Sequence, residues 1–490
     1  MSDSLVLAFN NVTTNALPFI FQDVATTPFS ESYLVAFSPE AAHYISLPFN
    51  VKEHDDFVKI FSGEKLPTGA RHTSQVYAGH QFGQFVSQLG DGRSISLGEI
   101  QDTEQNPIDI QLKGSGPTPY SRMGDGRAVL RSCVREFLAS EAMAALNIPT
   151  TRALCITSTN DPVYREKPEH GAIMTRLTPS NIRFGHFEYF FHHNKLEELD
   201  QLGSYCLEKL YPECLKADNP HQAMLLEVTH RTATLIAQWQ SIGFAHGVMN
   251  TDNMSILGLT IDYGPFAFLD NYEPEFICNH SDHQGRYAFD QQPSIGLWNL
   301  NALGYTFSRW LEPEDIRTAL ASYEPTLMSH YNLLMQQKLG LDQWLEKDKF
   351  LLGKLLSLMN KFKVDYTLAF RLLNTIFQED NTNQQCQVFI DLFDEQTDII
   401  TWLGTYRIRL RLQGRDDKRR HQQQNRVNPK YILRNYLAET AIRSANTGDF
   451  SEIERLRKVL TSPFAEQNEM NAYANQPPAW GREMEISCSS

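Results

Sequence analysis

Cysteine is scarce in this sequence, and its spacing excludes two classes of protein. The 490 residues contain seven cysteines, too few for a disulfide-stabilised scaffold, and no two have the C-x-x-C spacing of zinc or redox motifs. The count is typical of a protein from a reducing compartment. It is also odd, and Cys488 is the third residue from the end, where a role in a hydrophobic core is not expected. Both a reactive or pairing thiol and an idle one stay open there.

Long apolar runs and an early basic segment are also missing. The apolar stretch at 351–358 is interrupted by Gly353 and Lys354, and no run reaches the roughly 18 residues of a membrane-spanning helix. The first basic residue is Lys52, which argues against a secretory leader or an Arg-rich transit helix. We therefore expect a cytoplasmic chain that starts at Met1 and has no membrane partner.

Positive charge is in the minority. The chain has 44 Lys and Arg against 58 Asp and Glu, a net charge of −14 that opposes nonspecific binding to nucleic acid. Apolar residues make up 41% and charged residues 21%, as in globular rather than disordered proteins. A basic cluster at 407–420 includes Asp416 and Asp417 and lacks aromatic stacking residues. It favours a solvated face or an intramolecular contact over a nucleic-acid site.

The residue pattern predicts a β-rich part followed by an α-rich part. Residues 94–100 and 108–113 alternate as the strands of a hairpin, and further strands are predicted at 153–158 and 172–177. Helices are predicted over 128–146, where apolar residues recur every three or four positions, and over about 222–243. The predicted fold class is α+β, with an N-terminal extension without chemistry (1–75), a β-rich lobe (76–180), an α-rich lobe (181–410), and a C-terminal helical extension and tail (411–490).

Two glycine-rich segments are candidates for phosphate binding. The first is Y-A-G-H-Q-F-G-Q-F-V-S-Q-L-G-D-G-R (77–93), and the second repeats G-D-G-R at 124–127, at the start of the predicted helix. Glycine permits close backbone approach to phosphates, and a helix N-terminus favours anions. Neither segment has the P-loop spacing. Two ordinary tight turns with solvated arginines are the alternative.

A lysine and a glutamate form the next candidate pair. Lys113 ends the second strand of the predicted hairpin, and Glu136 lies 23 residues later in the predicted helix, on a polar position facing the sheet. Protein kinases present an ammonium to nucleotide phosphates with such a strand Lys and helix Glu. A lone strand lysine is otherwise a solvated edge residue.

The most informative motif follows the long helix. H-G-V-M-N-T-D-N (246–253) has the His-to-Asn spacing of the kinase catalytic loop, and I-D-Y-G-P (261–265) imitates D-F-G. Asn253 and Asp262 offer the hard oxygen ligands that magnesium requires. Val248 occupies the position of the usual catalytic Asp, while Asp252 supplies a carboxylate elsewhere in the same loop. Chance loops in this chain order are the weaker alternative.

These motifs together resemble the selenoprotein O family. The resemblance rests on G-D-G-R, Q-L-K-G-S-G-P-T, H-G-V-M-N-T-D-N-M-S, I-D-Y-G-P, N-P-K-Y-I-L-R-N-Y-L-A and the terminal C-S-S, which span nearly the whole chain. It implies a protein-kinase-like fold of two lobes without the usual catalytic Asp, long called a pseudokinase. It also implies that ATP binds in a flipped orientation and that AMP is transferred to protein hydroxyls with release of pyrophosphate.

The resemblance also assigns roles to individual residues. It implies that Asp252 accepts the proton, that Asn253 and Asp262 bind magnesium (or manganese), and that Arg176 and Arg183 reach the terminal phosphates. Several cations suit the developing charge of pyrophosphate. The implied nucleotide-binding residues are Gly90, Gly92, Arg93, Lys113, Asp125, Gly126, Arg176, Arg183 and Asp262.

The family carries selenocysteine or cysteine near its C-terminus, and this chain has the cysteine form at Cys488. The resemblance implies that this thiol can bond to a cysteine after the D-F-G-like motif, here Cys278, as a redox switch. The alternative is that Cys278 is a buried small hydrophobe.

Other functions stay open. Transfer from UTP with manganese is one alternative, because no base-recognising element is evident, and a catalytically silent ATP-binding scaffold is another. Val248 disfavours ordinary kinase activity. The expected partners are protein substrates, without nucleic acid, and we expect a monomer. His192 and His193 lack partners at metal-ligand spacing and are expected at the surface.

Overall fold

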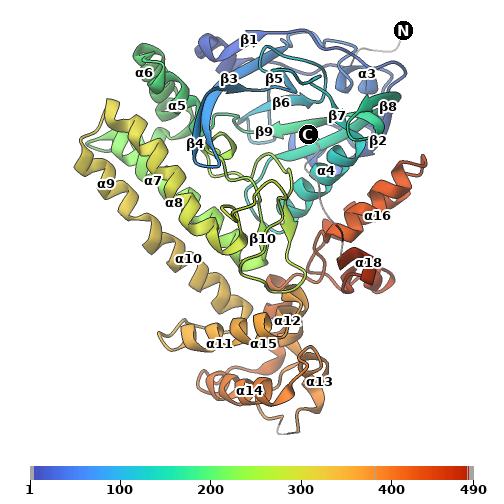
Figure 1. Ribbon diagram of the computed structural model, residues 1–490, viewed down its shortest axis with the longest axis vertical. Helices are drawn as coiled ribbons and strands as arrows, with labels where there is room; N and C mark the ends of the chain where they lie inside the picture. The colour runs from blue at the N-terminus through green and yellow to red at the C-terminus, as the bar shows by residue number, and fades with distance from the viewer. Residues whose placement is uncertain (1–4, 381, 483, 485–490) are drawn as a thin grey trace.

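The computed structural model describes residues 5–380, 382–482 and 484, and one large antiparallel sheet dominates its N-terminal part (Figure 1). The strands run in the order β1-β3-β5-β6-β9-β8-β2, with β4 paired to β3 and β7 to β9. They are β1 (Phe21–Asp23), β2 (Tyr33–Phe37), β3 (Thr73–Gln81), β4 (Gln84–Gly90), β5 (Ser94–Gln101), β6 (Pro107–Lys113), β7 (Ala128–Val129), β8 (Arg152–Tyr164) and β9 (Pro168–Thr178). A separate two-stranded sheet pairs β10 (Phe244–Ala245) with β11 (Ala267–Phe268).

The rest of the described chain is largely helical, which confirms the predicted α+β class. The helices are α1 (Val12–Ala16), α2 (Pro39–Tyr44), α3 (Phe57–Phe61), α4 (Leu130–Ala145), α5 (Phe184–His192), α6 (Leu196–Tyr205), α7 (Pro220–Ile242), α8 (Gln292–Thr306), α9 (Pro313–Ala321), α10 (Tyr323–Lys338), α11 (Asp348–Lys361), α12 (Tyr366–Leu372), α13 (Gln387–Ile390), α14 (Gln396–Arg411), α15 (Asp417–Val427), α16 (Asn435–Ala445), α17 (Ser451–Leu460) and α18 (Ala479–Arg482).

The predicted hairpin forms with a register that matters for the site. In β5 and β6, Ser94 pairs with Lys113, so the lysine lies beside the end of the first glycine-rich segment. The helix predicted from residue 128 begins only at Leu130, because Ala128 and Val129 first pair with β9 as β7. The second G-D-G-R turn is therefore not directly at a helix N-terminus.

The N-terminal segment is more than an irregular extension. Its short strand β1 pairs with β3, and β2 pairs with β8, so residues of the 1–75 segment form both ends of the strand order. Strands of three to five residues are too short to show a clear alternation of apolar and polar residues, which is why the sequence did not reveal them. The buried Phe57 and Phe61 of α3 pack against the sheet in a shared apolar core.

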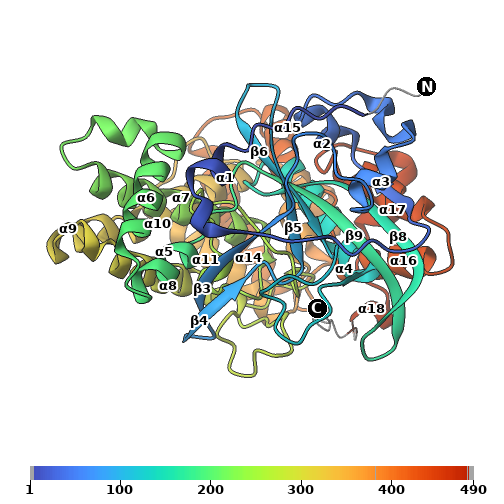
Figure 2. The same cartoon turned by 90° about the horizontal axis from the view of Figure 1, so that it is seen from above.

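The helices lie in groups around the sheet. Seen from above, α5 to α10 lie to one side of the sheet, and α16 and α17 lie to the other (Figure 2). Helices α11 to α14 surround a second apolar core, at the bottom of Figure 1. The basic cluster at 407–420 contributes buried arginines here: Arg420 donates to the backbone oxygen of Ile376 and to Asp417.

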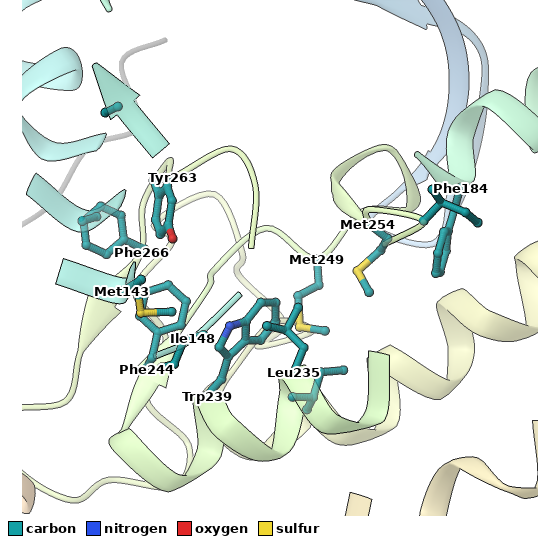
Figure 3. Packing of buried hydrophobic residues seen from close by; sticks show 14 of the residues in the cluster. Met143, Ile148, Phe184, Leu235, Trp239, Phe244, Met249, Met254, Tyr263 and Phe266 are labelled. Carbon is teal, nitrogen blue, oxygen red and sulfur yellow. The ribbon is translucent and has the colours of Figure 1, made fainter. Parts of the chain in front are cut away.

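Helix α7 leads directly into the loop at 246–253, which carries candidate site residues. Asn219 caps its start, with the side chain accepting from the backbone N–H of Gln222 at 3.2 Å, and Gly243 ends it with a left-handed φ of 71°. Leu235 and Trp239 of α7 lie near Met249 in Figure 3, and all three share one buried apolar cluster with Met254. These two methionines flank residues 250–253, so the loop that carries Asp252 lies directly on the core.

None of the helices in the described ranges combines the length and the apolar character needed to cross a bilayer.

Candidate functional site

A cavity of about 680 Å³ brings the predicted site residues together. Its walls come from the β3–β4 ribbon (residues 73–90), the end of β6, the turn at 120–127, and the segment that follows α7. Of the predicted residues, Gly90, Gly92, Arg93, Lys113, Asp125, Gly126, Arg183, Asp252, Asn253 and Asp262 line this cavity. Arg176 and Glu136 are buried and contact lining residues from behind.

A chain of buried ion pairs crosses the back of the cavity. The Lys113 ammonium contacts one oxygen of Glu136, and Arg176 contacts the other. Arg176 Nη2 also donates to Asp262 Oδ1 at 2.7 Å, and the second Asp262 oxygen accepts from Arg183. The network therefore joins β6, α4, β9 and the D-F-G-like turn at one point.

Burial and pairing act in opposite directions on these groups. Burial alone would raise the pKa of the Asp262 carboxyl, but Arg183, Arg176 and Lys113 outweigh it and hold this pKa well below its usual range. Burial likewise opposes the ionised form of Glu136, and Lys113 and Arg176 still keep its pKa lowered. Burial lowers the pKa of Lys113, and Glu136 counteracts this effect. Both carboxylates are thus ionised at neutral pH.

The cluster has more positive than negative charge. Three cations, Lys113, Arg176 and Arg183, pair with only two ionised carboxylates, and Arg93 adds a further cation to the cavity wall. Among the described residues Arg93 makes no ion pair. A cavity with buried surplus positive charge and N–H donors is suited to bind a multiply charged anion.

The 246–253 loop is fixed by its own hydrogen bonds. The buried His246 ring contacts the backbone oxygen of Ile261 through Nε2 at 2.9 Å, which joins the loop to the D-F-G-like turn. The Asn253 amide nitrogen donates to the Val248 oxygen at 3.1 Å. This bond directs the amide nitrogen away from ligands and leaves the side-chain oxygen as the atom that can bind a cation.

Asp252 lies in an environment unlike that of Asp262. Its side chain is buried, with 7% of the residue exposed, and burial raises its pKa to about 7 despite the nearby Arg183 guanidinium. Gln81 Nε2 donates to Oδ2 at 3.3 Å, while Oδ1 has no hydrogen-bond partner within the described chain. A carboxyl group that lines the cavity and has a pKa near neutrality can accept a proton from a substrate.

The residues fit a divalent cation only in part. Asn253 and Asp262 line the same cavity and offer oxygen ligands, and Asp262 has a left-handed φ of 57°, a conformation that Asp tolerates better than most residues. Within the described ranges no cluster of three His, Cys, Asp or Glu side chains could hold a metal by itself. Two protein ligands suit magnesium, which usually retains waters and substrate phosphates.

The turn at 120–127 depends on glycine and on a partner that the sequence did not reveal. Gly126 has a φ of +67°, and its Cα lies against the backbone of Gly116, so a Cβ there would overlap with it. Arg165, in the turn between β8 and β9, pairs with Asp125, with Nη1 2.8 Å from Oδ2. Arg165 lines the cavity too, but it lies 40 residues away along the chain, and no motif marks it.

Buried Asp91 is a further group that sequence analysis left without a role. It lies in the first G-D-G-R, lines the cavity, and accepts from the backbone N–H of Gln75 at 3.1 Å. Burial raises its pKa to about 6. The repetition of G-D-G-R was the available signal for it. The two histidines His192 and His193 are exposed, as predicted.

The predicted cysteine pair is described at one end only. Cys278 is buried, its thiol lies 3.7 Å from the backbone oxygen of Ala245, and a Cβ on Gly247 would come within 2.6 Å of the sulfur. It also lines a smaller cavity of about 210 Å³ whose wall includes Gln476, Arg482 and Met484. Cys488 lies outside the described residues.

Comparison with known proteins identifies the class of enzyme. The family model described as "Protein adenylyltransferase SelO" matches residues 4–461. "Protein nucleotidyltransferase YdiU" of Vibrio vulnificus (strain YJ016) is 50% identical over 483 residues, covering 97% of both chains. Proteins of the same name from Aliivibrio fischeri (strain MJ11) and Myxococcus xanthus (strain DK1622) are 49% and 47% identical, covering 96% and 95% of both chains.

These similarities and the cationic cavity define a protein nucleotidyltransferase, and the chain is therefore an enzyme that transfers nucleotidyl groups. Within this class, the chain belongs to the SelO family of protein adenylyltransferases.

Replacing Gly126 with Ala is expected to lower the free energy of unfolding by about 2 kcal/mol or more, because the new Cβ both overlaps Gly116 and requires an unfavourable φ. Binding of a fluorescent nucleotide analogue should weaken in parallel. Gly124→Ala is the matched control: its Cβ would lie 3.0 Å from the Ser121 oxygen without a positive φ, so it should cost less than about 1 kcal/mol. Equal thermal unfolding midpoints for the two variants would contradict this account of the turn.

Proposed function

We propose that this enzyme transfers AMP from ATP to Ser, Thr or Tyr hydroxyls of other proteins, on a two-lobed scaffold like that of protein kinases. One observation carries the proposal: the buried cations Lys113, Arg176 and Arg183 lie in the same site as Asp252, an acidic side chain with a pKa near neutrality. The cations suit a leaving pyrophosphate, and the carboxylate suits a hydroxyl nucleophile. The name of the family model supports AMP as the transferred group.

In the proposed reaction, Asp252 accepts the proton of the acceptor hydroxyl. The hydroxyl oxygen forms a bond to the α-phosphorus of ATP, and the bond from this phosphorus to the oxygen that bridges to the β-phosphate breaks. Pyrophosphate leaves with that electron pair, and Lys113, Arg93, Arg176 and Arg183 stabilise its charge. Gly90, Gly92, Asp125 and Gly126 shape the walls that hold the nucleotide.

Asn253 and Asp262 are the residues that would hold magnesium, or manganese in its place. When bound, such an ion neutralises phosphate charge and orients the reacting phosphate. The protein itself keeps Asp262 ionised through Arg176 and Arg183, so the carboxylate is ready to bind a cation without a prior loss of a proton.

UMP transfer from UTP with manganese is the second candidate. The relatives are named nucleotidyltransferases, and this name does not specify the nucleotide. A silent ATP-binding scaffold and an ordinary kinase are the remaining alternatives. We further propose that the enzyme acts as a monomer in the cytoplasm on protein substrates.

Labelled nucleotides separate these functions. With magnesium and a mixture of cellular proteins as acceptors, ATP labelled at the α-phosphate should give protein-bound label, whereas ATP labelled at the γ-phosphate should give none. Asp262→Asn should lower the rate by ~100-fold or more, because it replaces a charged cation ligand with a neutral amide and removes the carboxylate that Arg176 and Arg183 share. Asp290→Asn at an exposed position serves as the control.

Transfer of the γ label alone would replace the proposal with kinase activity. Transfer from α-labelled UTP with manganese, but not from ATP, would establish the second candidate. The absence of transfer from either nucleotide would leave a scaffold. Full activity of Asp262→Asn would refute the metal assignment.

The rate should depend on pH through Asp252. Burial raises the pKa of this carboxyl from 3.8 to about 7, so the proton-accepting form is lost as the pH falls through 7. We expect kcat/KM for ATP to rise with pH up to about 7 and then to level off. Asp252→Asn should reduce activity by ~100-fold or more and abolish this rise in its residual rate. A rise that persists in Asp252→Asn would assign the titration to another group.

We also propose a disulfide between Cys278 and Cys488 as a redox control. The place of Cys278 in a cavity that Arg482 and Met484 also line supports this proposal. Peptide maps of oxidised protein should contain a linked 278–488 peptide that disappears on reduction and in Cys488→Ser. If no such peptide forms under oxidising conditions, the disulfide is refuted.

A further inference from the structure

Three consecutive residues where β3 ends bind the loop that carries Asp252 or the segment that follows it, and none of the three has a part in the proposed reaction. Gln81 donates to Asp252 itself, as described above. On either side of it, the backbone N–H groups of His80 and Phe82 donate to the hydroxyls of Thr251, in the 246–253 loop, and of Tyr287, in the segment that follows it. The β3–β4 ribbon is therefore fixed over the loop at three successive positions.

The contacts of His80 close into a ring. The backbone N–H of His80 donates to the Thr251 hydroxyl oxygen at 2.6 Å, and this hydroxyl donates to one oxygen of Glu188. The other Glu188 oxygen contacts Nδ1 of the His80 ring. Three segments far apart in sequence thus share one cycle of hydrogen bonds: the ribbon, helix α5, and the residue directly before Asp252.

Glu188 is the centre of this ring and an unusual residue to bury. Its side chain is 0% exposed, and the described chain offers it a single ion-pair partner, His80, which is 20% exposed. An ionised carboxylate in such a place is costly unless both oxygens are bound, and here they are. Helix α5 can hold Glu188 in this position because Gly185 contacts the backbone of Ala78 in β3, where a Cβ would not fit.

A second connection runs in parallel to the ring. The backbone N–H of Phe82 donates to the Tyr287 hydroxyl at 2.9 Å, and this hydroxyl donates to Asn250 Oδ1 at 2.6 Å. Asn250 directly precedes Thr251. The side of Asp252 that faces the ribbon is left with little space, since a Cβ on Gly79 would lie 2.7 Å from Asp252 Oδ1.

We propose that the ring of His80, Glu188 and Thr251 positions Asp252 for proton acceptance by fixing the ribbon and the 246–253 loop to each other. The proposal rests on the proposed function, in that Asp252 is the proton acceptor there. The three side chains are positioning residues, because they act through Asp252 and do not line the cavity.

The ring lies apart from the groups that bind phosphate. Lys113, Arg176 and Arg183 pair with Glu136 and Asp262, and none of them contacts a ring member. Breaking the ring should therefore change the alignment of Asp252 with its substrate and leave nucleotide binding intact. Displacements of about 1 Å in an active site can cost ~100-fold in rate.

Glu188→Gln and Thr251→Val test the ring with nearly isosteric changes. Each is expected to lower kcat for α-label transfer by ~10- to 100-fold and to leave KM for ATP within about twofold. His80→Asn retains a donor near the position of Nδ1 and should keep more activity than His80→Ala. The matched controls are Glu197→Gln, an exposed glutamate at the start of α6, and His43→Asn, an exposed histidine on α2. Both controls should retain wild-type kcat.

A second measurement does not require activity. Hydrogen exchange of the His80 backbone amide should accelerate by ~10-fold or more in Thr251→Val, which lacks the acceptor, and in Glu188→Gln. Effects of the two substitutions on kcat should not add in the double variant, because either one opens the same ring.

Any of three results would overturn the proposal. The effects of the two substitutions on kcat could add in the double variant, or the loss of kcat/KM could come from a raised KM alone. The third is an unchanged hydrogen-exchange rate of the His80 amide. If Glu188→Gln or Thr251→Val does not fold, the partly exposed His80 provides the decisive pair, His80→Asn and His80→Ala, and equal kcat in both would overturn it. A wild-type enzyme that transfers no α label refutes the proposed function instead, and the exchange measurement still tests whether the ring fixes the ribbon.

Discussion

The buried contact between Asp262 and two arginines is the interaction on which the site depends. A charge removed from water must be paired, and a buried cation left without its partner costs about 3–5 kcal/mol. Here Arg176 and Arg183 share Asp262, and Arg176 continues to Glu136 and through it to Lys113. The sheet, α4 and the turn after the 246–253 loop can form this network only in one relative arrangement. The same ion pairs therefore make the cavity positive and join the sheet to the helical part.

The ribbon and the ion-pair network constrain opposite sides of the site. The network fixes the deep wall through charged groups, whereas the β3–β4 ribbon is held over Asp252 by hydrogen bonds from residues 80–82 to the loop below and to the segment after it. The ribbon can approach the loop and α5 this closely because Gly79 and Gly185 have no side chain. A Cβ on Gly79 would meet Asp252, and one on Gly185 would meet the backbone of Ala78. The glycine-rich sequence of this segment is explained here by contact between protein segments as well as by any contact with phosphate.

The sequence predicted those parts of the fold and site that local patterns determine. Alternation predicted β5 and β6, the apolar period predicted most of α4, and the motif spacing selected Asp252, Asn253 and Asp262, which line one cavity. Partners that lie far away in sequence could not be predicted in this way. Arg165 reaches Asp125 only because the β8–β9 hairpin is longer than its apolar runs suggest, and Glu188 meets Thr251 across 63 residues. The short β1 and β2 depend on pairing with longer strands, so their own residues give no clear signal.

Asp252 and Asp262 show how one cavity can support two roles for the same functional group. They lie ten residues apart, Asp252 is buried and Asp262 half-buried, and removal from water acts to raise the pKa of each. Asp262 accepts bonds from two guanidinium groups, which outweigh burial and keep it ionised. Asp252 is bound by the neutral Gln81 amide, while Arg183 donates to its backbone oxygen, so burial prevails and the pKa rises to about 7. Environments that separate the pKa values of two acids also separate their roles. A permanently ionised Asp262 suits cation binding, and an Asp252 that gains and loses a proton near neutral pH suits catalysis.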